Sequence, residues 1–133
     1  MCNCINRGTK HITLNKTNCI ENVIEKDSEF GKLRNHQCET KTLHTTIIDY
    51  TEAMRNINFE NCPETFSVAF KNHITAWDSM GEFTKKYSEL RGEMHNLFDS
   101  IKKTNDSLQF KILLKDIWNT WTHVEKAMTE EID

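Results

Sequence analysis

Two histidines and a cysteine in the first half of the chain are residue types that bind transition metals. One residue separates His36 from Cys38, and His44 follows six residues after Cys38. Because imidazole and thiolate are common zinc ligands, one hypothesis is a metal site at His36, Cys38 and His44. Structural zinc sites usually have tighter paired spacings. The alternative is therefore two solvated histidines and a structural or free Cys38.

His73 is the histidine whose position favours burial. It shares a helical face with Phe66, Phe70, Trp77 and Met80, which follow one another at steps of three and four residues. A buried histidine can act as a ligand, a base or a pH switch, so His73 and Trp77 are candidate ligand-binding residues. The competing interpretation is a core histidine satisfied by one hydrogen bond.

Trp118 and Trp121 lie three residues apart near the end of the chain, so both can occupy one side of a helix. Trp118 falls nearer the edge of the expected apolar stripe, where a tryptophan can anchor a partner protein. These two residues are the candidate partner-binding positions. The alternative is that Trp118 covers a neighbouring helix as part of the fold.

The common catalytic signatures do not occur in this sequence. It lacks a nucleophile elbow, a phosphate-binding glycine loop, a dinucleotide-binding glycine pattern and a zinc-protease motif. None of the six histidines follows a glutamate by three residues, as a di-iron bundle would require. We therefore expect no cofactor, and a non-catalytic role is favoured over an enzyme.

Helical periodicity dominates the chain after its first 35 residues. We predict an all-α fold: an antiparallel bundle of about four amphipathic helices over residues 36–133. Residues 1–35 are expected to be a polar, flexible and mostly irregular segment with one short helix over 18–26. The bundle helices are predicted over 38–58, from Pro63 to a break near Gly81, over 83–103, and from the turn at 104–107 to the end. Three helices with one of them bent are the alternative.

Charge and composition limit the classes of partner. Seventeen basic and twenty acidic residues give a formal charge of −3, which does not favour binding to nucleic acid. Hydrophobic residues make up 37% of the chain, and no apolar run is long enough for a transmembrane segment, so we expect a soluble protein.

The five cysteines bear on where the protein works. An odd number leaves at least one thiol unpaired within a single chain. A disulfide is expected only if the protein works in an oxidising compartment. Cys2 directly after Met1 suggests a lipoprotein whose signal peptide is missing, which favours a periplasmic or extracellular location. The alternative is an ordinary N-terminus of a cytosolic protein with reduced cysteines.

These observations favour a small non-catalytic helical protein that binds another protein, as an inhibitor, immunity factor or accessory factor. Assembly into a homo-oligomer is a further alternative. The alternative function is a helical bundle that binds a small ligand or a metal, and an enclosed cavity near His73 would favour it.

Overall fold

A computed structural model describes the backbone of residues 2–132 and the side chains of residues 16–129. This part of the chain is helical and contains no strand, so the predicted all-α class is confirmed. The elements are α1 (Cys2–Gln37), α2 (Leu43–Arg55), α3 (Glu64–Phe83), the short 3₁₀ helix η1 (Thr84–Tyr87), α4 (Met94–Lys102) and α5 (Ser107–Ile132).

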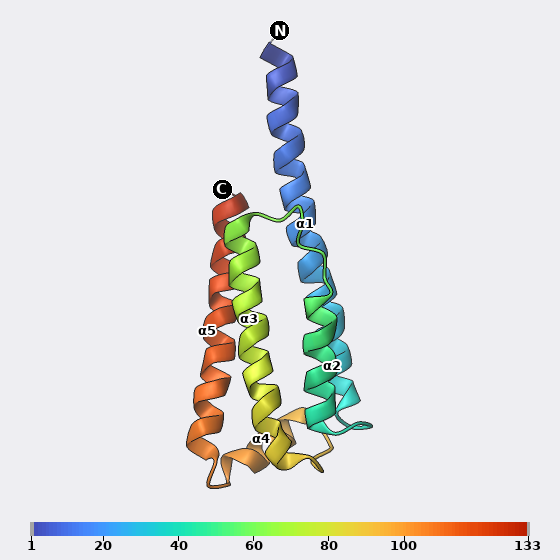
Figure 1. Cartoon of the computed structure of the whole chain (residues 1–133), viewed down its shortest axis with the longest axis vertical. Coiled ribbons are helices and arrows are strands. Elements are labelled where there is room, and N and C mark those ends of the chain that lie inside the picture. The colour runs from blue at the N-terminus through green and yellow to red at the C-terminus, as the bar shows by residue number, and fades with distance from the viewer. Residues whose placement is uncertain (1, 133) are drawn as a thin grey trace.

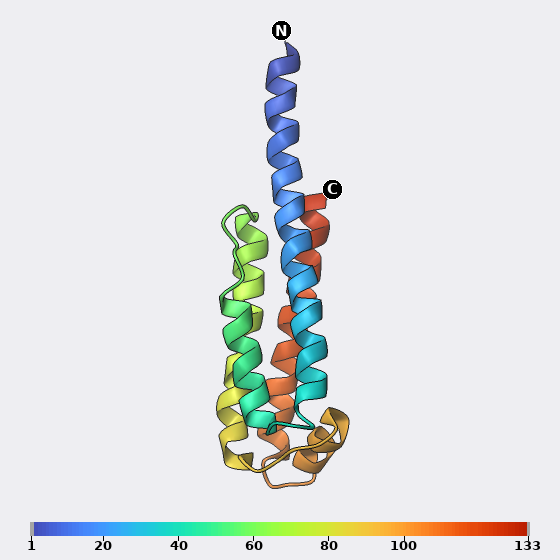
Figure 2. The ribbon, with the colours of Figure 1, turned by 90° about the vertical axis from the view of Figure 1, so that its right-hand side faces the viewer.

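Four helices, α1, α2, α3 and α5, run along the long axis of the molecule, and the short α4 lies across one end (Figure 1). The turned view shows the same arrangement, with the N-terminal part of α1 extending beyond the other helices (Figure 2). Helix α3 packs against both α2 and α5, whereas α1 packs mainly against α2. This arrangement is broadly that of the predicted bundle of about four helices.

The N-terminal segment differs from its prediction. Residues expected to be mostly irregular form the continuous helix α1, which contains the predicted short helix over 18–26. This segment is polar, has no sustained apolar period and contains Gly8 and Gly31, but a glycine within a helix costs only about 1 kcal/mol and the segment contains no proline. Burial of Ile20 and Val23 against the other helices supplies the compensating free energy.

Helices α2 and α3 follow the predicted apolar pattern closely. The residues Leu43, Ile47, Tyr50 and Met54 are buried along α2. The expected helix over 38–58 is nevertheless shorter, because Thr42 caps its start by accepting a hydrogen bond from the Thr45 backbone N–H. Helix α3 begins directly after Pro63, as predicted, and the whole predicted stripe of this helix is buried: Phe66, Phe70, His73, Trp77 and Met80.

The segment between α3 and α5 corrects one further prediction. Helix α3 ends at Phe83, two residues beyond the break predicted near Gly81. A Cβ at Gly81 would lie 3.0 Å from Ile48 Cδ1, so glycine permits close packing of α3 on α2. The single helix expected over 83–103 is instead η1, a loop and α4. Gly92 has φ 153°, which side-chain-bearing residues rarely adopt, and Glu93 then caps α4.

One disulfide joins α1 to the segment before α3, between Cys19 and Cys62. Cys38 is a buried free thiol whose Sγ donates to the Asn35 carbonyl at 3.3 Å. The disulfide that the cysteine content made possible is thus present in the structure, between Cys19 and Cys62. The lipoprotein prediction concerns Cys2, whose side chain lies outside the described residues.

None of the described helices is both long enough and apolar enough to span a membrane.

Candidate functional site

One pocket of about 360 Å³ is lined by residues from all five α-helices. Helix α4 contributes three of its lining residues, and the others come from α1, α2, α3 and α5. Its volume falls within the range typical of small-molecule sites, about 300–1,000 Å³. The residues lining it are Asp27, Arg34, Asn35, Tyr50, His73, Trp77, Met94, His95, Phe98, Leu114, Ile117, Trp118 and Trp121.

Aromatic rings form the inner wall of this pocket. Tyr50 and Trp77 meet edge to face with their ring centroids 5.3 Å apart, and both are almost fully buried. His73 and Trp121 lie beside them, with centroids also 5.3 Å apart. Because each ring is held by a neighbouring ring, the inner wall is apolar and preformed.

Arg34 projects from α1 over this wall. Its guanidinium carbon lies 4.5 Å from the Tyr50 ring centroid and 4.3 Å from the Trp77 centroid, both within the range of a cation–π interaction. Its Nε and Nη2 donate to Asn35 Oδ1 at 3.3 and 3.2 Å. The aromatic faces therefore fix the guanidinium at the pocket.

The acidic residue of the pocket, Asp27, is already engaged. The Tyr50 hydroxyl donates to Asp27 Oδ1 at 2.6 Å. Burial raises the pKa of Asp27, and the hydrogen bond from Tyr50 and the positive charge of Arg34 partly offset this. This hydrogen bond ties α1 to α2 at the point where both contribute to the pocket.

His73 is held neutral at physiological pH. Its Nδ1 lies 2.8 Å from Thr120 Oγ1, which links α3 to α5. Burial, together with the nearby charge of Arg34, lowers the pKa of His73 to about 4, although a hydrogen bond to the backbone of Ile117 acts in the opposite direction. Arg34 is therefore the principal positive charge among the groups on the inner wall.

The rim of the pocket is exposed. Trp118 is 63% exposed although it lines the pocket. The exposed His95, which also lines the pocket, places Nδ1 2.9 Å from Oε1 of Glu93, the residue that caps α4. A bound group could thus be covered by Trp118 while its other end reaches solvent.

The three candidate metal ligands are not brought together. Cys38 is buried in the turn after α1, and His36 is exposed. His44 faces the end of α3, where its Nδ1 lies 2.9 Å from the Gly81 carbonyl and 3.1 Å from Thr84 Oγ1. Because a carbonyl oxygen only accepts, His44 donates there and joins α2 to α3. Within the described residues, no group of three or more potential ligands could hold a metal ion.

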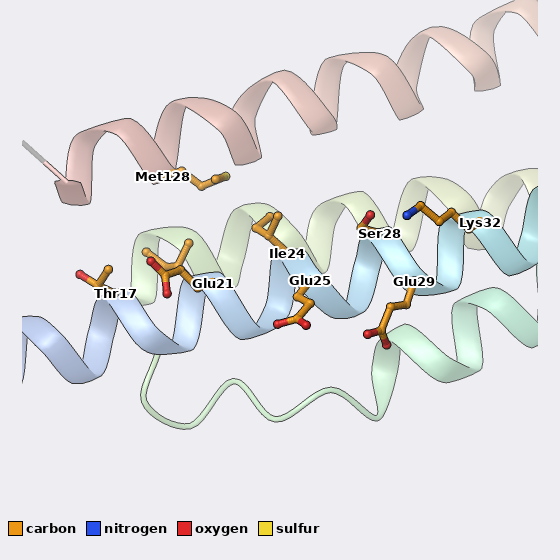
Figure 3. Close-up of a pocket in the computed structure, with 9 residues that line it drawn as sticks. Thr17, Glu21, Ile24, Glu25, Ser28, Glu29, Lys32 and Met128 are labelled. Carbon is orange, nitrogen blue, oxygen red and sulfur yellow. The ribbon is translucent and has the colours of Figure 1, made fainter.

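A second, larger groove of about 500 Å³ lies between α1 and the end of α5 (Figure 3). Eight of its lining residues belong to α1, and Met128 alone comes from α5. Its wall contains no aromatic ring, and its charged groups are the exposed side chains of Glu21, Glu25, Glu29 and Lys32. The first pocket is therefore the better candidate site.

Outside the metal hypothesis, the sequence indicated four candidate binding residues: His73, Trp77, Trp118 and Trp121. All four line the first pocket. Arg34, Asp27 and Tyr50 were not anticipated, because in sequence they resemble ordinary positions of two other helices. No family model, curated protein or solved structure matches the chain.

Proposed function

We propose that this is a non-catalytic binding protein that holds a small aromatic ligand in the pocket between α1, α3 and α5. The observation that carries the proposal is the convergence of all three tryptophans of the chain, with Tyr50 and His73, on one pocket. Aromatic side chains with a few fixed polar groups are the usual lining of such sites.

The polar groups that line the pocket support binding over catalysis. Asp27 is bonded to Tyr50, and His73 is bonded to Thr120. Covalent catalysis requires a nucleophile bonded to a base and a third group that orients the base. Among the described residues, neither the Tyr50 hydroxyl nor the Thr120 hydroxyl belongs to such a set of three groups. The polar groups of the pocket orient a ligand and keep the inner wall rigid.

The first test is occupancy of the pocket by a neutral two-ring probe, naphthalenemethanol. Since every tryptophan lines the pocket, we expect the probe to shift the indole N–H signals of Trp77, Trp118 and Trp121 in a proton–nitrogen NMR spectrum. Replacing Leu114, which lines the pocket, by Trp should fill the space and weaken binding at least about tenfold.

The matched control is Leu108→Trp on the same helix, because Leu108 is 73% exposed and lies outside the pocket. It should bind the probe like the original protein. Unchanged indole signals at saturating probe, or equal weakening by both substitutions, would contradict the proposal.

A partner protein is the second candidate occupant. Trp118, Leu108 and Ile112 are all more than half exposed on α5, and exposed aromatic and aliphatic side chains on one helix are typical of docking surfaces. In this alternative function, the protein acts as an inhibitor, immunity factor or accessory factor. A side chain of the partner protein then enters the pocket beside Trp118.

Trp118→Ala distinguishes an exposed anchor from a structural lid. Because the ring is 63% exposed, we expect the free energy of unfolding to change by less than about 1 kcal/mol in urea denaturation. Trp121→Ala, on a half-buried ring packed on His73, should cost about 3 kcal/mol or more. Equal losses in the two variants would show that Trp118 is part of the core.

We also propose that the protein works in an oxidising compartment, in the periplasm or outside the cell. The Cys19–Cys62 disulfide supports this, because such bonds persist there and are rare in the cytosol. Mass spectrometry of protein taken from its native source tests it. The fully reduced mass would contradict this location.

A further inference from the structure

The charge at the pocket wall indicates what the aromatic ligand should carry. Arg34 makes no ion pair within 4.0 Å among the described side chains, unlike Arg55, which pairs with Asp78. The nearest acidic group in the pocket, Asp27, instead accepts from Tyr50. Arg34 is thus a fixed cation beside an apolar wall without a carboxylate of its own.

The guanidinium also has unused donors. It carries five N–H groups. Nε and Nη2 donate to Asn35 Oδ1, and the guanidinium also makes a hydrogen bond to the Tyr50 hydroxyl, which leaves N–H groups for a ligand. Asn35 is exposed, so this contact competes with water and a better acceptor can replace it. A carboxylate matches the planar fork of arginine and can accept two hydrogen bonds from it.

The other charged groups facing the pocket do not compete for such an acceptor. Asp27 lies on the same helix as Arg34 and weakens its field without pairing with it. His73 on α3 is neutral near pH 7, and His95 on α4 lies at the exposed rim beside Glu93. Arg34 is therefore the group that would select the charge of a ligand.

We propose that the ligand is an aromatic carboxylate, whose ring stacks in the tryptophan-lined pocket while its carboxylate accepts hydrogen bonds from Arg34. This inference rests on the proposed ligand-binding function and specifies its ligand class. Packing against Trp118 and Trp121, whose rings are more exposed than that of Trp77, would place the ring, and replacement of Asn35 Oδ1 by the carboxylate would complete the guanidinium's hydrogen bonding.

The test compares three probes of one shape at neutral pH: naphthoate, neutral naphthalenemethanol and cationic naphthylmethylamine. Dissociation constants are measured from the indole N–H signals. We expect naphthoate to bind at least about tenfold more tightly than the alcohol, since a hydrogen bond to a charged group is worth about that factor or more. The amine should bind most weakly because Arg34 repels it.

Arg34→Gln should remove the preference, so that naphthoate and the alcohol bind alike, whereas Arg91→Gln, an exposed arginine outside the pocket, should retain it. Arg34→Lys provides a second variant that keeps the positive charge but loses the planar fork, and it should retain only part of the preference. Circular dichroism checks that each variant is folded.

The outcomes separate the two proposals. If the alcohol binds but the original protein does not prefer naphthoate, or if Arg34→Gln keeps the preference, the carboxylate inference is overturned and the ligand-binding function stands. If none of the three probes shifts an indole signal, the proposed ligand-binding function fails, and the inference fails with it.

Discussion

Reduction of the Cys19–Cys62 disulfide is expected to lower the free energy of unfolding by about 4 kcal/mol. The bond closes a loop between residues 43 positions apart, and the loss of loop-closure entropy in the unfolded chain gives this value for a loop of that size. A typical domain is stabilised by only about 5–15 kcal/mol, so the effect should be large. Urea denaturation with and without dithiothreitol measures it.

The structure also indicates where reduction acts first. Cys19 lies on α1, which packs mainly on α2, and its disulfide is the covalent connection between α1 and the segment preceding α3. Hydrogen exchange should therefore increase in α1 around Cys19 more than in α3, whose apolar stripe is buried between α2 and α5.

The control is the double variant Cys19→Ser with Cys62→Ser. It should match the reduced protein in stability and should not respond to dithiothreitol, because the remaining described cysteine, Cys38, is already a free thiol. A stability change below about 1 kcal/mol on reduction would show that the bond does not constrain the unfolded chain as the loop-entropy argument requires.

Acidification is expected to destabilise the protein through His73 by about 3 kcal/mol between pH 7 and pH 4. The pKa of His73 is about 4 in the folded protein, against an ordinary value of 6.5. Between these values the unfolded chain binds a proton that the folded chain does not, so stability is complete above pH 6.5 and falls as the pH decreases toward 4. Each pKa unit corresponds to about 1.4 kcal/mol.

Comparison with His73→Gln isolates this contribution. Burial raises the pKa of Asp27, which acts in the opposite direction, because the folded protein then holds that proton more firmly as the pH falls. Asp27 is present in both proteins, so its effect largely cancels in the difference. The original protein should lose about 3 kcal/mol more than the variant between pH 7 and pH 4, and parallel stability curves would refute the assignment.

Local patterns predicted those parts of the fold where one helix carries its own start signal and a long apolar stripe. Helix α3 begins at Pro63 as expected, and Phe66, Phe70 and Trp77 are buried as their spacing indicated. The turn before α5 was also anticipated at residues 104–107. Such features depend on neighbours within a few residues, which sequence displays directly.

The predictions for two segments were wrong, for opposite reasons. Helix α1 has a weak apolar pattern, and its helical state depends on burial of Ile20 and Val23 by other helices. The segment 83–103 has a strong pattern, yet Gly92 and the Glu93 cap divide it into η1, a loop and α4. In α1, contacts with helices distant in sequence outweighed the weak periodicity. In segment 83–103, one backbone conformation at Gly92 outweighed the strong periodicity.

The sequence predicted some residues of the candidate site but not their arrangement in space. His73 was marked by its place in an apolar stripe, and the tryptophans by their size and spacing. The hypothesis of a shared metal site for His36, Cys38 and His44 relied on closeness in sequence, but a turn follows α1 there, and His44 faces the end of α3.

By itself, the sequence determined that the chain is helical, which residues of α3 are buried, and which aromatic residues are candidates for binding, because these depend on side-chain type and helical spacing. Tertiary structure alone decided that three tryptophans and His73 share one pocket, that Arg34 lies over Tyr50 and Trp77, and that Cys19 pairs with Cys62. The physical reason is that helical periodicity specifies which face of a helix is apolar, whereas the neighbour that covers that face depends on how all the helices pack together.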